Sequence, residues 1–257
     1  MNTILEARGL MKTFGAVTAA NDVCASIAEH SITGLIGTNG AGKTTFVNMV
    51  TGYLKPASGS IHFAGRDITP LPPRQITRLG IARSFQIPQL YDTLTVRENL
   101  VVALGIVLRN AKPSFFSKLP VQVPGHNGSL ETVVDNLMAQ FNLADYGDRV
   151  ARVLPQGVRK QLDIAMAMAG KPQVLLLDEP TSGVAAEEKF GIMDMIMNVV
   201  RAEKVTVLFV EHDMDIVSRY SDRVLAFYDG RIIADQAPED ALNNPEVQRY
   251  VTGKRHA

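Results

Sequence analysis

The sequence predicts an α/β protein in which helices cover a largely parallel sheet. Segments with strand character alternate with helical segments along the chain, which is typical of parallel sheets. Two strand segments, 174–177 and 205–210, are almost wholly apolar, as central strands buried on both faces are. With 257 residues, 46% of them apolar, the chain is long enough for one large globular unit or for one domain carrying a subdomain.

The predicted elements follow in order. A short buried strand at 31–37, SITGLIG, runs into a glycine-rich turn, and a helix begins near Gly42. Further strands are expected at 60–63, 174–177, 205–210 and 224–227, and the turn Asp229-Gly230 favours a hairpin that residues 231–235 close.

The segment from about residue 92 to 165 has helical patterns and no convincing strand. Within it, residues 110–130 are rich in Pro, Gly, Ser and Lys, which indicates an irregular, exposed insertion. The sequence therefore predicts an α/β core that a helical region interrupts.

Charge and composition limit the classes of function that the chain can have. The net charge is zero and the pI is near 7.0, so no global field attracts nucleic acid or an anionic membrane surface. The only cysteine, Cys24, excludes an internal disulfide, fits a reducing compartment and is expected to be a small buried apolar residue. The N-terminus lacks the apolar core of a signal peptide, and the apolar run at 100–108 is too short to span a bilayer. Any membrane role is therefore expected to depend on partner subunits.

A phosphate-binding loop stands between the first buried strand and its helix. The segment matches the Walker A pattern G-x-x-x-x-G-K-[ST], which is typical of P-loop nucleotide-binding proteins. Its backbone amides and the helix N-terminus favour phosphate, so we expect ATP there, with Lys43 reaching the β- and γ-phosphates and Thr44 binding Mg²⁺. The residues expected to bind nucleotide are Gly37, Thr38, Asn39, Gly40, Ala41, Gly42, Lys43, Thr44, Thr45 and, from the resemblance described below, Phe14.

Two acids end the apolar strand at 174–177. In a parallel sheet, ligands bind at the carboxyl ends of the strands, where Asp178 and Glu179 would lie. Asp178 is expected to hold Mg²⁺ through water, and Glu179 to act as the general base on the attacking water.

Three more residues, in order and at characteristic spacing, give the sequence a resemblance to the ABC ATPases over essentially its whole length. Phe14 occupies the position of the aromatic residue that stacks on adenine, Gln86 matches the Q-loop glutamine that senses Mg²⁺ and the attacking water, and His212 matches the histidine that contacts the γ-phosphate. The resemblance implies a RecA-like P-loop NTPase core, about 1–91 and 166–257, with an N-terminal antiparallel β part. It also implies an inserted α-helical subdomain at about 92–165.

The subfamily follows from four further segments, which look like those of the ATP-binding subunits of branched-chain amino acid importers. They are residues 83–86 (RSFQ), 94–100 (LTVRENL), 210–215 (VEHDMD) and 250–253 (YVTG). The insertion near 109–130 resembles the paralogue with the longer helical subdomain. The resemblance implies two transmembrane permease subunits, a paralogous ATPase as the dimer partner and, indirectly, a periplasmic or extracellular solute-binding protein. It also implies a peripheral location on the cytoplasmic face of the inner membrane and no nucleic acid partner.

Two elements depart from the family pattern. The signature loop, LSGGQ in consensus, reads Leu154-Pro155-Gln156-Gly157-Val158 before a helix expected at 159–169, and Ala185 stands where the D-loop usually has Asp or Asn. In ABC dimers both elements act on the nucleotide held by the other subunit. Either the family tolerates this change, or this chain contributes less to its partner's site than to its own.

Three other functions remain open at this point. They are an exporter ATPase of the lipopolysaccharide type, a soluble ABC protein without membrane partners, and a structural subunit that binds ATP but hardly hydrolyses it. The single neutral cassette disfavours the soluble protein, and the presence of Glu179 and His212 disfavours the structural one.

Overall fold

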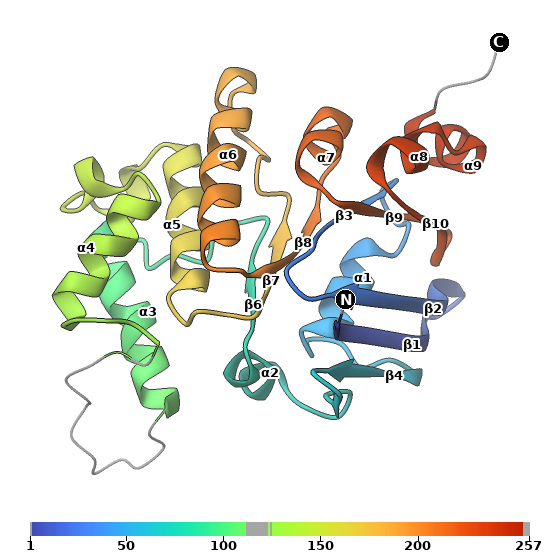
Figure 1. The fold of residues 1–257 in the computed structure, drawn as a ribbon, viewed down its shortest axis with the longest axis horizontal. Helices are drawn as coiled ribbons and strands as arrows, with labels where there is room; N and C mark the ends of the chain where they lie inside the picture. The colour runs from blue at the N-terminus through green and yellow to red at the C-terminus, as the bar shows by residue number, and fades with distance from the viewer. Residues whose placement is uncertain (1, 112–122, 124, 254–257) are drawn as a thin grey trace. The chain divides into compact units, whose positions relative to one another are not determined.

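The computed structural model describes residues 2–111, 123 and 125–253, in two compact units (Figure 1). The first unit comprises Met1–Ile81 and Val205–Ala257, and the second comprises Ala82–Lys204. Most of the insertion predicted at 110–130 lies outside the described residues. The predicted division into a core and a helical subdomain at 92–165 stays a prediction.

The first unit begins with an antiparallel sheet. Its long strand β1 (Thr3–Phe14) pairs on one side with β2 (Val17–Ala28) and on the other with β4 (Ser58–Phe63), and β5 (Arg66–Asp67) pairs with β4. The antiparallel N-terminal part expected from the family resemblance is thereby confirmed.

A parallel set of strands follows in the same unit. Strand β3 (Ile32–Gly37) lies between β8 (Thr206–Val210) and β9 (Arg223–Tyr228) and is parallel to both. Every residue of β3 and β8 is buried, which explains why their sequences are apolar runs without alternation. The predicted parallel α/β class is confirmed.

A tight hairpin joins β9 to β10 (Arg231–Gln236), as the sequence predicts. Asp229 and Gly230 both have positive φ, 47° and 73°, the combination that type I′ hairpin turns require. The Gly230 amide donates to the Ala41 carbonyl at 3.1 Å, and the Gly230 carbonyl accepts from the Asn21 amide at 2.8 Å. The turn therefore supports the glycine-rich loop after β3.

Aromatic and aliphatic side chains form the core of this unit. Phe46 on α1 (Lys43–Val50) and Phe227 on β9 are both buried, and their ring centroids are 5.6 Å apart. Phe209 on β8 is also fully buried. The remaining elements of the unit are α2 (Pro73–Leu79), α7 (Met214–Tyr220), α8 (Pro238–Asn243), α9 (Pro245–Val247) and the π-helical segment η3 (Gln248–Thr252).

The second unit is mainly helical, with two adjacent strands, β6 (Ile81–Ser84) and β7 (Val174–Asp178). Helix α3 (Val96–Ala111) packs against both α4 (Leu130–Gln140) and α5 (Gln156–Met168), and α5 packs against α6 (Ala186–Ala202) and β7 (Figure 1). Between residues 92 and 165 the described chain forms helices and one isolated bridge, Thr95 to Val150. The short 3-10 helical segments of the unit are η1 (Ala144–Tyr146) and η2 (Ala151–Val153).

Two expectations need correction. Cys24 is exposed, because residues alternate across strand β2 and Val23 and Ala25 take the buried positions beside it. The Cys24 sulfur accepts a hydrogen bond from the Gly9 amide at 3.1 Å. The helix expected at 159–169 begins three residues earlier, at Gln156, because Pro155 serves as its N-cap in an extended conformation.

Candidate functional site

The glycine-rich loop between β3 and α1 depends on its glycines. Gly37, Gly40 and Gly42 have φ values of 150°, 80° and 109°. A Cβ atom at Gly37 would lie 2.4 Å from the Phe227 carbonyl oxygen, and one at Gly42 would lie 2.6 Å from the Ala19 carbonyl oxygen. No other residue fits these two positions without moving the backbone, so this tight loop requires glycine at both of them.

Lys43 lies within the curl of this loop. Its Nζ donates to the carbonyl oxygens of Gly37 at 2.6 Å and Thr38 at 3.1 Å, and the residue is only 5% exposed. Thr38, Asn39 and Gly40 are exposed at the crest, and α1 begins at Lys43. An ammonium group and a helix N-terminus at one exposed turn together attract an anion, which fits a phosphate.

Two further predicted residues belong to the same unit. Phe14 ends β1 and is 51% exposed, with the Lys12 ammonium 5.7 Å from its ring centroid. His212 is exposed just after β8, and its backbone amide donates to the buried Glu211 carboxylate at 3.2 Å. Since β8 runs parallel beside β3, His212 and the glycine-rich loop follow neighbouring strand ends at one sheet edge.

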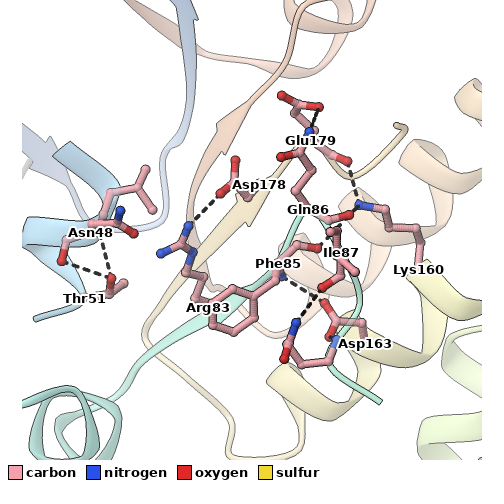
Figure 2. A network of polar contacts seen from close by, with 12 residues as sticks. Asn48, Thr51, Arg83, Phe85, Gln86, Ile87, Lys160, Asp163, Asp178 and Glu179 are labelled. Carbon is pink, nitrogen blue, oxygen red and sulfur yellow. Dashed lines mark hydrogen bonds and ion pairs between the residues drawn. The ribbon is translucent and has the colours of Figure 1, made fainter. Parts of the chain in front are cut away.

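The two acids at the end of β7 contact residues at the end of β6 and just after it (Figure 2). Asp178 forms a buried ion pair with Arg83, with 2.6 Å between its Oδ2 and the arginine Nη2. Glu179 accepts a hydrogen bond from the Gln86 side-chain amide at 2.7 Å. The structure thus brings together three residues that the sequence predicts for one site: Gln86, Asp178 and Glu179.

Glu179 has an unusual backbone conformation. Its φ is 48°, in the left-handed region that residues other than glycine rarely adopt. Such conformations cost free energy and persist only where neighbouring contacts hold them, and they are enriched at functional sites. Glu179 is therefore a candidate for a functional carboxylate on conformation as well as on sequence.

Sequence reasoning missed two charged residues on α5. The Lys160 ammonium donates to the carbonyl oxygens of Gln86 at 2.6 Å and Glu179 at 3.0 Å (Figure 2). The Asp163 carboxylate accepts from the amides of Phe85 at 3.1 Å and Gln89 at 3.0 Å. Both residues are buried. The one signal for them in the sequence is a Lys and an Asp among the apolar residues of a predicted helix.

The environment of Asp163 alters its acidity. Burial raises the pKa of its carboxyl group to about 6, although the amides of Gln89 and Phe85 and the charge of Lys160 act in the opposite direction. Desolvation is thus the larger effect at this residue.

Gln156 lies beside the segment that precedes Ala185, so the two departures from the family pattern are close together. A Cβ atom at Gly183 would be 3.3 Å from the Gln156 Cγ, so the side chain that replaces a signature glycine packs beside the segment before Ala185. Pro155 and Gln156 are exposed and Leu154 is buried. Ala185 is the N-cap of α6 and provides no side-chain hydrogen bond to the helix.

The donor atoms suit a hard cation. Mg²⁺ is usually held by one or two protein oxygens together with phosphate oxygens and waters. Thr44 is exposed in the first turn of α1, and Gln86 and Asp178 supply an amide and a carboxylate oxygen in the second unit. Within the described residues no group of three or more His, Cys, Asp or Glu side chains could hold a metal by itself. The side chains of Thr44, Gln86 and Asp178 each offer an oxygen of the kind that Mg²⁺ accepts alongside phosphate.

The chain is similar to known proteins over its whole length. Residues 20–182 match the family described as ABC transporter. The high-affinity branched-chain amino acid transport ATP-binding protein LivG of Salmonella typhimurium is 36% identical over 251 residues, covering 98% of both chains. LivG of Escherichia coli K12 is 35% identical over 254 residues, and BraF of Pseudomonas aeruginosa is 34% identical over 251 residues, each with 98% of both chains covered.

Solved structures show the same fold. A structure of MJ1267, described as an ATP-binding cassette of an ABC transporter, matches with a TM-score of 0.82 and 31% identity, covering 97% of this chain and 98% of that one. The ADP conformation of MJ1267 matches with a TM-score of 0.80 and 30% identity over the same shares of the two chains. Among the described helices, none has the length and apolar character that crossing a membrane would require.

Proposed function

Since the chain belongs to the ABC transporter family, we propose that it is the ATP-binding and ATP-hydrolysing subunit of an importer for branched-chain amino acids or a related small polar solute. The resemblance stated from the motifs and the ATPase assignment are confirmed by the family match and by full-length similarity to ATP-binding subunits. The observation that carries the proposal is the glycine-rich loop curled around Lys43, in a chain that belongs to this family.

Nucleotide binding is assigned to the first unit. Lys43 would neutralise charge on the β- and γ-phosphates, and the loop amides from Gly37 to Thr45 would bind phosphate oxygens. Phe14, an aromatic ring half exposed at the end of β1, would stack on the adenine. The arrangement of Lys43 supports this assignment, because its ammonium already lies against the loop carbonyls.

Hydrolysis is assigned to three polar residues. Glu179 would accept the proton of the attacking water, Gln86 would orient that water, and His212 would contact the γ-phosphate. The hydrogen bond between Gln86 and Glu179 supports a shared task for these two residues. Thr44, Asp178 and Gln86 would hold Mg²⁺, which supplies neutralisation of phosphate charge when bound.

The partners follow from the subfamily. The chain would work with two transmembrane permease subunits and a paralogous ATPase at the cytoplasmic face of the inner membrane, and indirectly with an extracytoplasmic solute-binding protein. A surface after Gln86 supports permease docking: Ile87 is 75% exposed and Tyr91 is 45% exposed. Of the residues between them, Leu90 is half-buried and Pro88 is buried.

The names of the relatives support amino acid transport. They give no support to a lipopolysaccharide exporter, a soluble ABC protein or a non-hydrolysing subunit. The division of the chain into a core, about 1–91 and 166–257, and a helical subdomain at 92–165 is retained as part of this proposal.

Two substitutions test the proposal in the complex purified with its permeases. Lys43→Ala removes a charge held within the loop and should abolish ATP binding at micromolar nucleotide. Glu179→Gln keeps the shape of the side chain but cannot accept a proton, so ATP should still bind while turnover falls ~10²-fold or more. Parental affinity in the first variant, or near-parental turnover in the second, would overturn the assignment. Uptake of labelled leucine by vesicles containing the complex tests the cargo.

A further inference from the structure

Lys160 is one of the most deeply buried residues of the second unit, at 1% exposure. An ammonium group is removed from water at a large free-energy cost unless acceptors replace the water. Its Nζ lies 2.6 Å from the Gln86 carbonyl, 3.0 Å from the Glu179 carbonyl and 3.5 Å from the Phe85 carbonyl. Lys160 therefore joins α5 to the backbone of two residues assigned to hydrolysis (Figure 2).

Asp163 holds the same segment from the other side. It lies one helical turn after Lys160, and its two carboxylate oxygens accept from the amides of Phe85 and Gln89. Residues 85–89 are thus bound through their carbonyls by a cation and through their amides by an anion. We refer to Lys160 and Asp163 as the α5 clamp.

The clamp binds Glu179, the residue with the strained backbone conformation. Glu179 keeps a φ of 48° while its carbonyl is bound by Lys160 and its side chain is bound by Gln86. An ion–dipole contact to that carbonyl offsets the cost of the left-handed conformation. Without the ammonium, an extended backbone at Glu179 would become accessible, and the carboxylate would leave its present direction.

We propose that Lys160 is a positioning residue for ATP hydrolysis, which fixes the carboxylate of Glu179 and the amide of Gln86 through their own backbones, with Asp163 completing the hold on residues 85–89. The inference rests on the proposed function, since it takes Glu179 as the general base. It differs from a merely structural role, because a buried lysine that only stabilised the fold would affect nucleotide binding and turnover together.

Lys160→Met tests the proposal in the full-length chain assembled with its partners. The variant keeps the length of the side chain and removes the charge. We expect kcat to fall ~10-fold or more, as for the loss of a charge-assisted hydrogen bond, with the Kd for ATP unchanged. Lys160→Arg, which restores a cation, should recover part of the turnover. Lys171→Met is the matched control, since that lysine makes a surface ion pair with Glu203 away from these contacts.

A second readout does not depend on turnover. The sequence contains no tryptophan, so in the purified full-length chain Ile87→Trp places a single tryptophan on the exposed part of the clamped segment. Fluorescence anisotropy of this probe should fall in Lys160→Met and in Asp163→Asn, and stay at its parental value in Lys171→Met. Asp163→Asn carries the test independently if Lys160→Met does not fold.

Combining Lys160→Met with Glu179→Gln distinguishes failure of this inference from failure of the proposed function. In the Glu179→Gln background, Lys160→Met should cause no further loss of kcat, because its effect acts through that carboxylate. An additive loss, parental kcat in Lys160→Met, or unchanged anisotropy would overturn the inference while Glu179→Gln alone remains inactive. If Glu179→Gln itself hydrolyses at the parental rate, the proposed function fails instead.

Discussion

Asp163 places a negative charge in a buried position, where it holds two amides at a cost. The pKa of its carboxyl is raised to about 6 from an ordinary value of 3.8, mainly by burial. A group whose pKa is raised on folding adds stability that is fully present below the unfolded-state pKa and is lost as pH rises through the folded-state pKa. For this residue the window runs from about pH 4 to somewhat above pH 6.

The first prediction is that lowering the pH stabilises the chain through Asp163. From about pH 7.5 to about pH 5, the free energy of unfolding of the parent should increase relative to Asp163→Asn by about 1.4 kcal/mol, because roughly one unit of the pKa difference lies above pH 5. Asparagine cannot titrate, so the comparison isolates this one group. Urea unfolding of both proteins at the two pH values measures the difference. A gap between them that stays constant with pH would contradict the assignment.

At the scale of secondary-structure elements, α6 begins without a side-chain cap. Ala185 has the extended conformation of an N-cap, with φ −59° and ψ 144°, but its methyl group accepts no hydrogen bond from the first turn. Asp and Asn are favoured at this position because their oxygen binds a free amide of the helix. The family pattern has one of these two residues here, so this departure carries a structural cost as well.

The second prediction is that Ala185→Asp stabilises the chain. Capping α6 should add about 1 kcal/mol and raise the Tm by roughly 2–4 °C. Ala185→Asn serves as the neutral comparison, because Glu187 and Glu188 in the first turn repel an added carboxylate. Thermal unfolding followed by circular dichroism measures both variants. No increase in either one would show that residue 185 does not cap the helix in solution.

The third prediction concerns the segment after β6. If Ile87 and Tyr91 face a permease, single cysteines at 87 and 91 should crosslink to a membrane subunit in a Cys24→Ser background, which removes the one native and exposed thiol. Val17→Cys is the matched control, since Val17 is an apolar residue 64% exposed in the antiparallel sheet. Equal crosslinking from residue 17, or labelling at 87 and 91 that the permease does not change, would argue against docking here.

Across the whole molecule, the sequence predicted the features that depend on local patterns, namely the strands and the phosphate loop. Apolar runs marked β3, β7, β8 and β9, and the motif around Lys43 marked the phosphate loop. The α5 clamp could not be predicted, because Lys160 and Asp163 bind main-chain groups 19 to 78 residues away, and every residue carries such groups. The exposure of Cys24 was missed because no strand was predicted at residues 17–28. Once the strand is known, the alternation shows it: Asp22 and Ser26 share the exposed face with Cys24, opposite Val23, Ala25 and Ile27.

The last prediction concerns the working dimer. In a homodimer, Pro155, Gln156 and Ala185 would face both nucleotides, and both sites would lack the signature serine and the D-loop acid. The Gln156 side chain lies beside Gly183, two residues before Ala185, so the two departures are close to each other in the second unit. We expect instead a heterodimer in which a paralogous ATPase with an intact signature completes the site built on Lys43 and Glu179, while its own nucleotide faces the altered loop.

If the two nucleotide sites are unequal, the same substitution should have unequal effects on turnover in the two subunits. Losing one charge-assisted hydrogen bond to phosphate costs roughly 1.5–3 kcal/mol, or about 10- to 150-fold in the step that uses it. Glu179→Gln in this chain should therefore remove most of the turnover of the complex, whereas the equivalent change in the partner should remove little. Pro155→Ser with Gln156→Gly should raise the contribution of the partner's site, which ATPase assays of the purified complex measure. Equal losses from the two glutamate variants, or full coupled transport with this chain as the sole ATPase, would show that the two sites are equivalent.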